Sequence, residues 1–207
     1  MVDCAVIGGG VIGLAVARAM ALRGCEVVVL EAAAAVGTVT SARNSEVIHA
    51  GLYYPPGSLK ATACVAGNRR LVEYCRSHGV AHRLPGKLIV ATDDAEEAQL
   101  EALMDSGCAN GVELNWLSGA QARALEPNLS CCRALSSPST GIIDSHGLML
   151  ALQGDAEAQG AVVALKAPVL GGVVRDHGIR LRVGGSEPMD LDCRRVVNCA
   201  GFDAPPI

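Results

Sequence analysis

The sequence predicts an α/β fold in which a Rossmann-like dinucleotide-binding domain is interrupted by an inserted α+β lobe. Three observations lead to this fold class. A glycine-rich turn lies between an apolar strand and an alanine-rich helix near the N-terminus, the chain changes character near residue 83, and an alternating helix and strand pattern returns after residue 144. The expected domains are therefore residues 1–82 with 145–207 for the discontinuous binding domain, and 83–144 for the lobe.

Composition excludes several classes of protein. Half of the 207 residues are hydrophobic, which suffices for one domain or for a domain with an inserted lobe. The net charge is −4 without a basic run, so nucleic acid is not an expected partner. No apolar stretch reaches the ~18 residues of a membrane span, and we expect no signal peptide because a strand-like segment begins at Val2. The nine cysteines contain no CxxC pair and are interpreted as reduced core residues, with no metal site.

The first unit of the chain has the order strand, turn, helix, strand. Residues 3–7 form a short apolar run typical of a buried parallel strand. The turn is Gly8-Gly9-Gly10-Val11-Ile12-Gly13, which fits G-x-G-x-x-G. A helix is expected over Leu14–Leu22, ending near Gly24, and Val27–Leu30 follows as a second strand.

Each glycine of the turn has a distinct physical task. Gly8 permits the tight turn out of the strand, Gly10 lets a pyrophosphate approach the backbone, and Gly13 lets the helix pack closely on the strand. Glu31 ends the second strand, 18 residues after Gly13 (31 − 13). Its carboxylate can accept hydrogen bonds from ribose hydroxyls and would repel a 2′-phosphate, which disfavours NADP. A dinucleotide site is therefore expected, and the alternative is a purely structural glycine turn.

The fingerprint alone leaves FAD and NAD open. Residues 32–40 are small and loop-like, and they lead into the polar segment SARNSEVIHAG. An NAD-binding domain of this type returns promptly to another helix and strand. The long polar segment instead favours the flavoprotein pattern.

The remaining elements follow from capping and turn signals. Ser58 and Gly79 are expected to begin and end a helix over Leu59–Ser77. The lobe is expected to contain strands at 86–91 and 114–117, a helix at 94–110, a short helix after the Ser118 capping box that ends near Pro127, and strand pieces at Leu135 and 141–144. A helix at 148–159, a strand at 161–165, a hairpin of 168–175 with 178–183, and a strand at 196–201 are expected after it.

Several longer motifs carry a resemblance to a known family. They are VIGGGVIGLAVARAMALRG, GTVTSARNSEVIHAGLYYPPGSLKA, GKLIVAT, ALEPNL, SPSTGIIDSHGLM and VVNCAG. The chain resembles the D-amino-acid-oxidase-like superfamily of FAD oxidoreductases and, within it, the L-2-hydroxyglutarate dehydrogenases. The resemblance covers residues 6–201, and its second motif is the most specific.

The resemblance implies FAD as the cofactor and an FAD-binding domain of the glutathione-reductase class. It places Val169 near the adenine and Ala200 and Gly201 beside the cofactor. The polar segment would run along the ribityl chain and pyrophosphate, with contacts from Ser41, Arg43, Asn44 and Ser45. Members of the family are considerably longer, so the fold is expected to be incomplete at its C-terminus.

The resemblance also bears on two side chains of the substrate site. His49 would lie close to the flavin ring, where a histidine can orient substrate, remove the hydroxyl proton, stabilise reduced flavin or carry flavin covalently. The alternative is a structural loop histidine. Lys87 could face the carboxylates of the substrate, and the alternative is an ordinary edge-strand charge.

The implied activity is oxidation of L-2-hydroxyglutarate, a 2-hydroxy dicarboxylate, to 2-oxoglutarate, with hydride transfer to flavin and a quinone as one possible acceptor. The alternatives are a related flavin oxidase for an amine or glycerol phosphate, a truncated non-catalytic FAD-binding protein, and a nicotinamide dehydrogenase. The implied location is mitochondrial for a eukaryotic chain and cytoplasmic or peripheral to the inner membrane for a bacterial one.

Overall fold

The computed structural model describes residues 1–205 and divides the chain into two compact units. The first unit comprises Met1–Ser45 and the segment from Ser145 onward, and the second unit is Glu46–Asp144. The second unit therefore begins at residue 46 and not at residue 83. The reason is that strands β3 (Val47–Ile48) and β4 (His82–Arg83) both pair with β8 (Gly141–Ile143), which ties residues 46–82 to the segment that follows.

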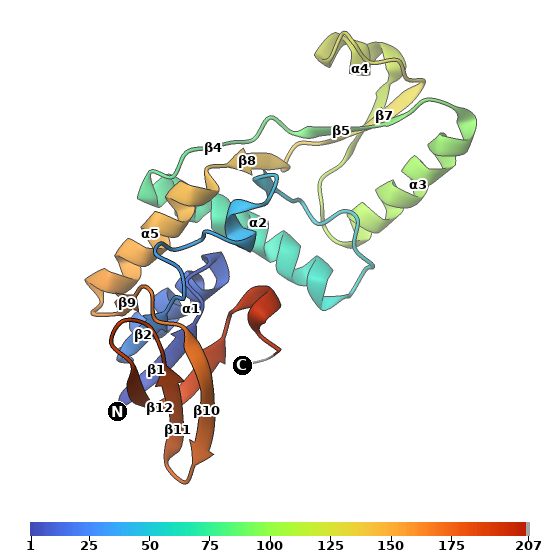
Figure 1. The fold of residues 1–207 in the computed structure, drawn as a ribbon. Coiled ribbons are helices and arrows are strands. Elements are labelled where there is room, and N and C mark those ends of the chain that lie inside the picture. The colour runs from blue at the N-terminus through green and yellow to red at the C-terminus, as the bar shows by residue number, and fades with distance from the viewer. Residues whose placement is uncertain (206–207) are drawn as a thin grey trace. The chain divides into compact units, whose positions relative to one another are not determined.

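The first unit is built on a six-stranded sheet with the order β10-β11-β12-β1-β2-β9 (Figure 1). The bounds of its strands are β1 Val2–Ile7, β2 Val27–Leu30, β9 Val162–Ala164, β10 Val169–Arg175, β11 Gly178–Val183 and β12 Met189–Asn198. Strands β12, β1, β2 and β9 run parallel to one another. The mixed α/β fold with a parallel sheet is as predicted.

Strand β12 joins two parts of this sheet. Residues Met189–Cys193 pair antiparallel with β11, and Cys193–Asn198 pair parallel with β1. The predicted strand at 196–201 was therefore too short at its start and too long at its end. Polar and charged residues at 190–195 hid the first half of the strand, because this half belongs to an exposed hairpin.

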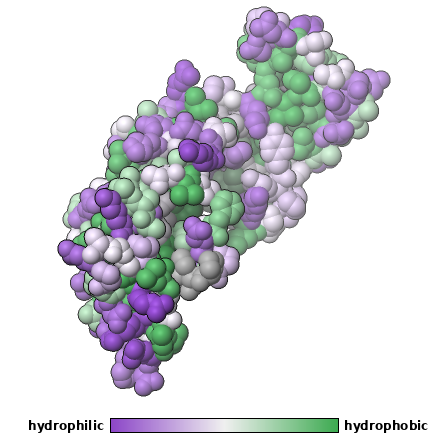
Figure 2. Space-filling model, in the orientation of Figure 1, coloured by the Kyte–Doolittle hydropathy of each residue, from purple (hydrophilic) through white to green (hydrophobic). Residues whose placement is uncertain are grey.

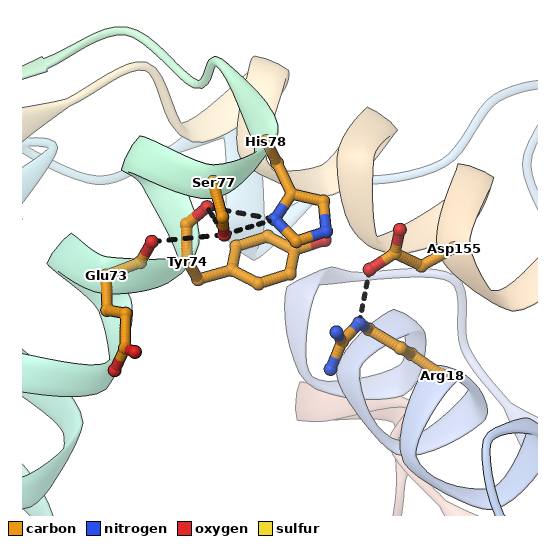
Figure 3. A network of polar contacts seen from close by, with 6 residues as sticks. All are labelled: Arg18, Glu73, Tyr74, Ser77, His78 and Asp155. Carbon is orange, nitrogen blue, oxygen red and sulfur yellow. Dashed lines mark hydrogen bonds and ion pairs between the residues drawn. The ribbon is translucent and has the colours of Figure 1, made fainter.

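Helices α1 (Val11–Ala21) and α5 (Ser145–Ala158) pack against each other on one face of the sheet. Small side chains make this packing close, and the buried cluster consists of Cys4, Val6, Ala17, Ala21, Val27, Val29, Ala156 and Ala161. The Arg18 guanidinium donates to the Asp155 carboxylate and links the two helices (Figure 3). Helix α1 begins at Val11, three residues before its predicted start at Leu14, so that Gly13 lies inside its first turn.

The buried thiols in this sheet behave as apolar core groups. Cys4 and Cys193 are fully buried, and all nine cysteines of the chain are free. Burial raises the pKa of the Cys4 and Cys193 thiols, and neighbouring thiols add to the rise. Both groups are therefore protonated at neutral pH and pack without the cost of a buried charge.

The β10–β12 meander carries a well-formed ion pair. Arg180 Nε and Nη2 donate to the two carboxylate oxygens of Asp192, each at 2.7 Å. These hydrogen bonds from Arg180 lower the pKa of Asp192 below its usual range. The two residues are cross-strand partners in the β11–β12 ladder, so the pair fixes the register of an exposed hairpin.

In the second unit, helix α2 (Leu59–His78) has the two predicted caps. The Ser58 hydroxyl accepts from the Ala61 N–H at 3.2 Å, and Gly79 ends the helix in the left-handed conformation at φ 66°. At its last turn the rings of Tyr74 and His78 stack at 3.9 Å, while the Ser77 hydroxyl contacts His78 Nδ1 at 2.8 Å (Figure 3).

The rest of the second unit is a three-stranded antiparallel sheet with helices on it. Its order is β5-β7-β6, and the bounds are β5 Lys87–Ala91, β6 Asn115–Ser118, β7 Arg133–Ser137, α3 Asp94–Ala109 and α4 Gly119–Leu125. The predicted capping box at Ser118 and Gln121 is present, and α4 ends before Pro127. Figure 2 shows hydrophobic surface over the region of this sheet and α4, where Leu125 is exposed.

Candidate functional site

The carboxyl ends of three neighbouring parallel strands form the candidate cofactor site in the first unit. Strand β1 lies between β12 and β2, and its chain continues into α1 through the glycine turn. Gly8 has φ +98°, and a Cβ on it would lie 2.7 Å from the carbonyl oxygen of Cys199. Only glycine fits there, because the Cys199 N–H is itself bonded to the Ile7 carbonyl at 2.8 Å.

The N-terminus of α1 offers free donors at this edge of the sheet. Gly10 is its N-cap residue, and a Cβ added to Gly13 would overlap the carbonyl oxygen of Gly8. Among residues 1–205, the N–H groups of Gly10, Ile12 and Gly13 have no hydrogen-bond acceptor. Unpaired N–H groups at a helix N-terminus attract anions, so this turn fits a pyrophosphate.

The segment after β2 returns to the same turn. The Ser41 hydroxyl accepts from the Val11 N–H at 3.0 Å, and Gly37 N–H donates to the Gly9 carbonyl at 3.0 Å. Ser41 is therefore beside the helix N-terminus, as the predicted contact with a pyrophosphate requires. The other three predicted residues of this segment, Arg43, Asn44 and Ser45, are exposed. The Asn44 side chain donates to the Ser41 carbonyl at 2.6 Å.

Glu31 holds two backbone segments together. Its Oε2 accepts from the Gly9 N–H at 2.6 Å, and its Oε1 accepts from the Ala33 N–H at 2.8 Å. A carboxylate has about four lone-pair positions, so capacity remains for ribose hydroxyls. The Ala167 N–H donates to the Glu31 carbonyl at 2.9 Å, which brings the start of β10 and Val169 toward this acid.

Ala200 and Gly201 follow β12 at the same edge. The Cα of Ala200 would lie 3.2 Å from a Cβ on Gly8, and a Cβ on Gly201 would lie 3.8 Å from Thr40 Oγ1. The structure thus gathers most of the predicted cofactor residues around one glycine turn. Together they present N–H groups that can donate to an anion at a helix N-terminus, and a carboxylate that can accept from hydroxyl groups at the end of β2. This combination fits a dinucleotide such as FAD.

In the second unit, His49 follows β3 and has a fixed backbone and an exposed side chain. Its carbonyl accepts from Asn68 Nδ2 at 3.1 Å and from Cys64 Sγ at 3.5 Å, both on α2. The next residue, Ala50, is buried, and Gly51 has φ +101° with Val65 against it. The loop therefore presents the imidazole to solvent from a rigid support.

Two features of these sites went beyond the sequence prediction. The backbone N–H groups of Gly9 and Ala33 bind Glu31, and no pattern of residue types reveals such contacts. Tyr53 pairs with Lys87, with Lys87 Nζ 3.2 Å from the Tyr53 hydroxyl. The only available signal was the Tyr-Tyr pair in the motif that contains His49.

Comparisons with known proteins show the family of the chain. Residues 3–207 match the family described as FAD dependent oxidoreductase. The chain is 43% identical to mitochondrial L-2-hydroxyglutarate dehydrogenase of Arabidopsis thaliana, covering 98% of this chain and 48% of the relative. It is 34% identical to L-2-hydroxyglutarate dehydrogenase of Escherichia coli strain K12, covering 99% of this chain and 48% of that relative. The chain thus spans about half the length of these curated relatives.

A solved structure also matches. The fold is similar to that of FAD-bound L-alpha-glycerophosphate oxidase from Mycoplasma pneumoniae, with a TM-score of 0.86 and 25% identity over 94% of this chain and 53% of the other. The family match extends over both units and confirms the expected resemblance and its FAD cofactor. The chain belongs to the family of FAD dependent oxidoreductases.

Proposed function

We propose that the protein containing this chain oxidises L-2-hydroxyglutarate to 2-oxoglutarate with FAD. The observation that carries this proposal is the 43% identity to the Arabidopsis L-2-hydroxyglutarate dehydrogenase across 98% of the chain, which includes residues of both units. Bound FAD supplies the acceptor for a hydride from C2 of the substrate. The glycine turn and Glu31 hold the dinucleotide, as their free N–H groups and lone pairs permit.

His49 is the residue that we propose as the general base. A neutral imidazole nitrogen accepts the proton of the substrate C2 hydroxyl while the C2 hydride leaves, and the C–O bond becomes a carbonyl. The fixed carbonyl of His49 and its exposed side chain support this assignment. We further propose a quinone as the electron acceptor, since the relatives are named dehydrogenases.

The location follows the source of the chain. The Arabidopsis relative is named mitochondrial, and we propose the same compartment for a eukaryotic chain, with the cytoplasm or the inner-membrane surface for a bacterial one. Across residues 1–205, no helix combines the length and the hydrophobicity needed to cross a lipid bilayer.

Anaerobic reduction of the flavin tests the proposed function. The purified protein is expected to show flavin absorbance bands, and L-2-hydroxyglutarate is expected to bleach them while glycine, L-proline and sn-glycerol 3-phosphate do not. Acid precipitation then separates covalent flavin, which stays in the pellet, from non-covalent flavin. Bleaching by glycerol phosphate alone would instead favour the second candidate, a glycerophosphate oxidase, which the similarity to the Mycoplasma enzyme supports. A flavin that no substrate bleaches would favour a non-catalytic FAD-binding protein.

The variant His49→Gln is expected to reduce the rate of flavin bleaching by about 100-fold or more, because general-base catalysis contributes on that order. Its FAD absorbance should remain unchanged, so that the slower bleaching is assigned to the reaction and not to loss of the cofactor. His177→Gln removes another exposed loop histidine and serves as the control. A bleaching rate in His49→Gln equal to that of His177→Gln would exclude His49 as the base.

A further inference from the structure

Two lysines of the second unit lie on two adjacent tyrosines. Lys87 Nζ is 3.2 Å from the Tyr53 hydroxyl and 4.8 Å from the centre of its ring. Lys60 Nζ is 4.5 Å from the centre of the Tyr54 ring. Among the residues that the structure describes, no carboxylate lies within 4.0 Å of either ammonium group. This surface therefore carries positive charge that the described part of the chain does not neutralise.

The Tyr53 side chain stands on a rigid loop. Asn110 Nδ2 donates to the carbonyls of Gly51 and Tyr54, at 3.2 and 2.8 Å, on either side of it. Between them Leu52 is 1% exposed, whereas Tyr53 is 47% exposed. A tyrosine that is held at its backbone and open at its ring loses little entropy when it binds a ligand.

Lys87 is equally well placed. It is the first residue of β5, where it pairs with Ser137 of β7, and its side chain is half-buried. The same β7 end leads to Ser139, whose carbonyl accepts from Asn68 Nδ2 at 2.9 Å. Asn68 also binds the carbonyl of His49. One amide therefore ties the loop of His49 to the strand end beside Lys87.

We propose that Lys87 and Tyr53 together bind the C5 carboxylate of the substrate, the end remote from the C2 hydroxyl; this assignment rests on the proposed function. Lys87 uses one N–H to donate to the Tyr53 oxygen and keeps two for a ligand. The tyrosine O–H is then free to donate as well. Two donors 3.2 Å apart suit the two oxygens of a single carboxylate.

The pair would set the specificity of the enzyme. The second carboxylate of a dicarboxylic 2-hydroxy acid binds to both Lys87 and Tyr53. A monocarboxylic 2-hydroxy acid of the same length leaves the charge of Lys87 without a partner. The chemistry at C2 is the same for both compounds. The pair therefore distinguishes them through binding and not through the limiting rate of hydride transfer.

The test compares Lys87→Met and Tyr53→Phe with the wild type, all with FAD bound. Lys166→Met removes the same charge from an exposed lysine of the first unit and serves as the matched control. Anaerobic flavin reduction is measured with L-2-hydroxyglutarate and with L-2-hydroxyvalerate. Binding of glutarate, which carries no hydroxyl to oxidise, is measured by titration calorimetry.

In Lys87→Met, the L-2-hydroxyglutarate concentration for half-maximal reduction and the glutarate Kd are both expected to rise about tenfold, as loss of a charged hydrogen bond predicts. The limiting reduction rate and the response to hydroxyvalerate should change little. Tyr53→Phe keeps the ring and removes the hydroxyl, so the half-maximal L-2-hydroxyglutarate concentration and the glutarate Kd are expected to rise only a few-fold.

Equal glutarate binding by Lys87→Met and Lys166→Met would overturn the assignment, whatever substrate the enzyme uses. An equal rise of the half-maximal concentration for hydroxyvalerate in Lys87→Met would also overturn the assignment, because the pair would then not recognise the second carboxylate. If L-2-hydroxyglutarate fails to reduce the wild-type flavin, the proposed function fails, and glutarate binding still decides whether the pair takes a dicarboxylate. If glycerol phosphate reduces it and this reaction depends on Lys87, the pair binds a phosphate and not a carboxylate.

Discussion

Gly8→Ala is expected to destabilise the first unit by about 3 to 5 kcal/mol and to prevent FAD binding. The added methyl group would lie 2.7 Å from the Cys199 oxygen and 2.9 Å from the Cys199 carbonyl carbon. Both atoms belong to the backbone that extends the pairing of β12 with β1, so they move only if that pairing breaks. The left-handed φ of Gly8 adds a conformational cost. The measurement is the denaturant midpoint, together with flavin content.

Gly24→Ala is the matched control for this prediction. Gly24 also has a positive φ, +77°, but a Cβ on it meets no atom within 4 Å. Its substitution is expected to cost only about 1 kcal/mol, from conformation alone. The difference between the two variants isolates the contact with Cys199. If Gly8→Ala proves no less stable than Gly24→Ala, the close approach of β1 and β12 at this point is wrong.

Gly10→Ala separates folding from cofactor binding in the same turn. Gly10 has an ordinary φ of −78°, and its Cβ would approach only the Ser41 hydroxyl, at 3.0 Å, so that a small shift of this side chain is enough to accommodate it. Gly8 is thus needed for the fold, whereas Gly10 keeps the path open for a ligand at the N–H groups of α1.

The first forty residues were the most predictable part of the chain because their constraints are local. The glycine spacing, the apolar strand before it and the acid at the end of β2 each reflect a steric or electrostatic need within one β-α-β unit. Their positions relative to one another hold in the structure, down to the Cβ contacts of Gly8 and Gly13. The helix start was displaced by three residues because the fingerprint does not show that Gly13 is helical.

Long-range pairing was harder to predict. Strands β3 and β4 have two residues each, which is too few for a periodic pattern, and both depend on pairing with the distant strand β8. His82 pairs with Ile143, 61 residues later (143 − 82), and Val47 pairs with Ile142, 95 residues later (142 − 47). This pairing moved the boundary of the second unit to residue 46. The link between Tyr53 and Lys87 likewise depends on the meeting of a loop and a strand that no local signal connects.

Glu31→Gln is expected to destabilise the first unit by roughly 2 to 3 kcal/mol and to weaken FAD binding by about 10- to 100-fold. The carboxylate accepts from Gly9 and Ala33 with one oxygen each, at 2.6 and 2.8 Å. An amide has only one oxygen, so its NH₂ group must face one of these two N–H groups. That contact leaves a donor without an acceptor and loosens the glycine turn. The amide also has fewer lone pairs for the ribose hydroxyls of FAD.

Glu26→Gln provides the comparison at the opposite end of the same strand. Glu26 immediately precedes β2, and its side chain is exposed, so its loss of charge should leave the unfolding midpoint and the FAD dissociation constant within error of the wild type. Unfolding is measured on the flavin-free protein, so that loss of bound FAD does not enter the stability difference. The FAD titration is then run separately on both variants. A normal unfolding midpoint in Glu31→Gln with weakened FAD binding would assign Glu31 to the ribose alone. A lower unfolding midpoint together with weaker FAD binding would identify Glu31 as the residue that shapes the glycine turn before FAD binds.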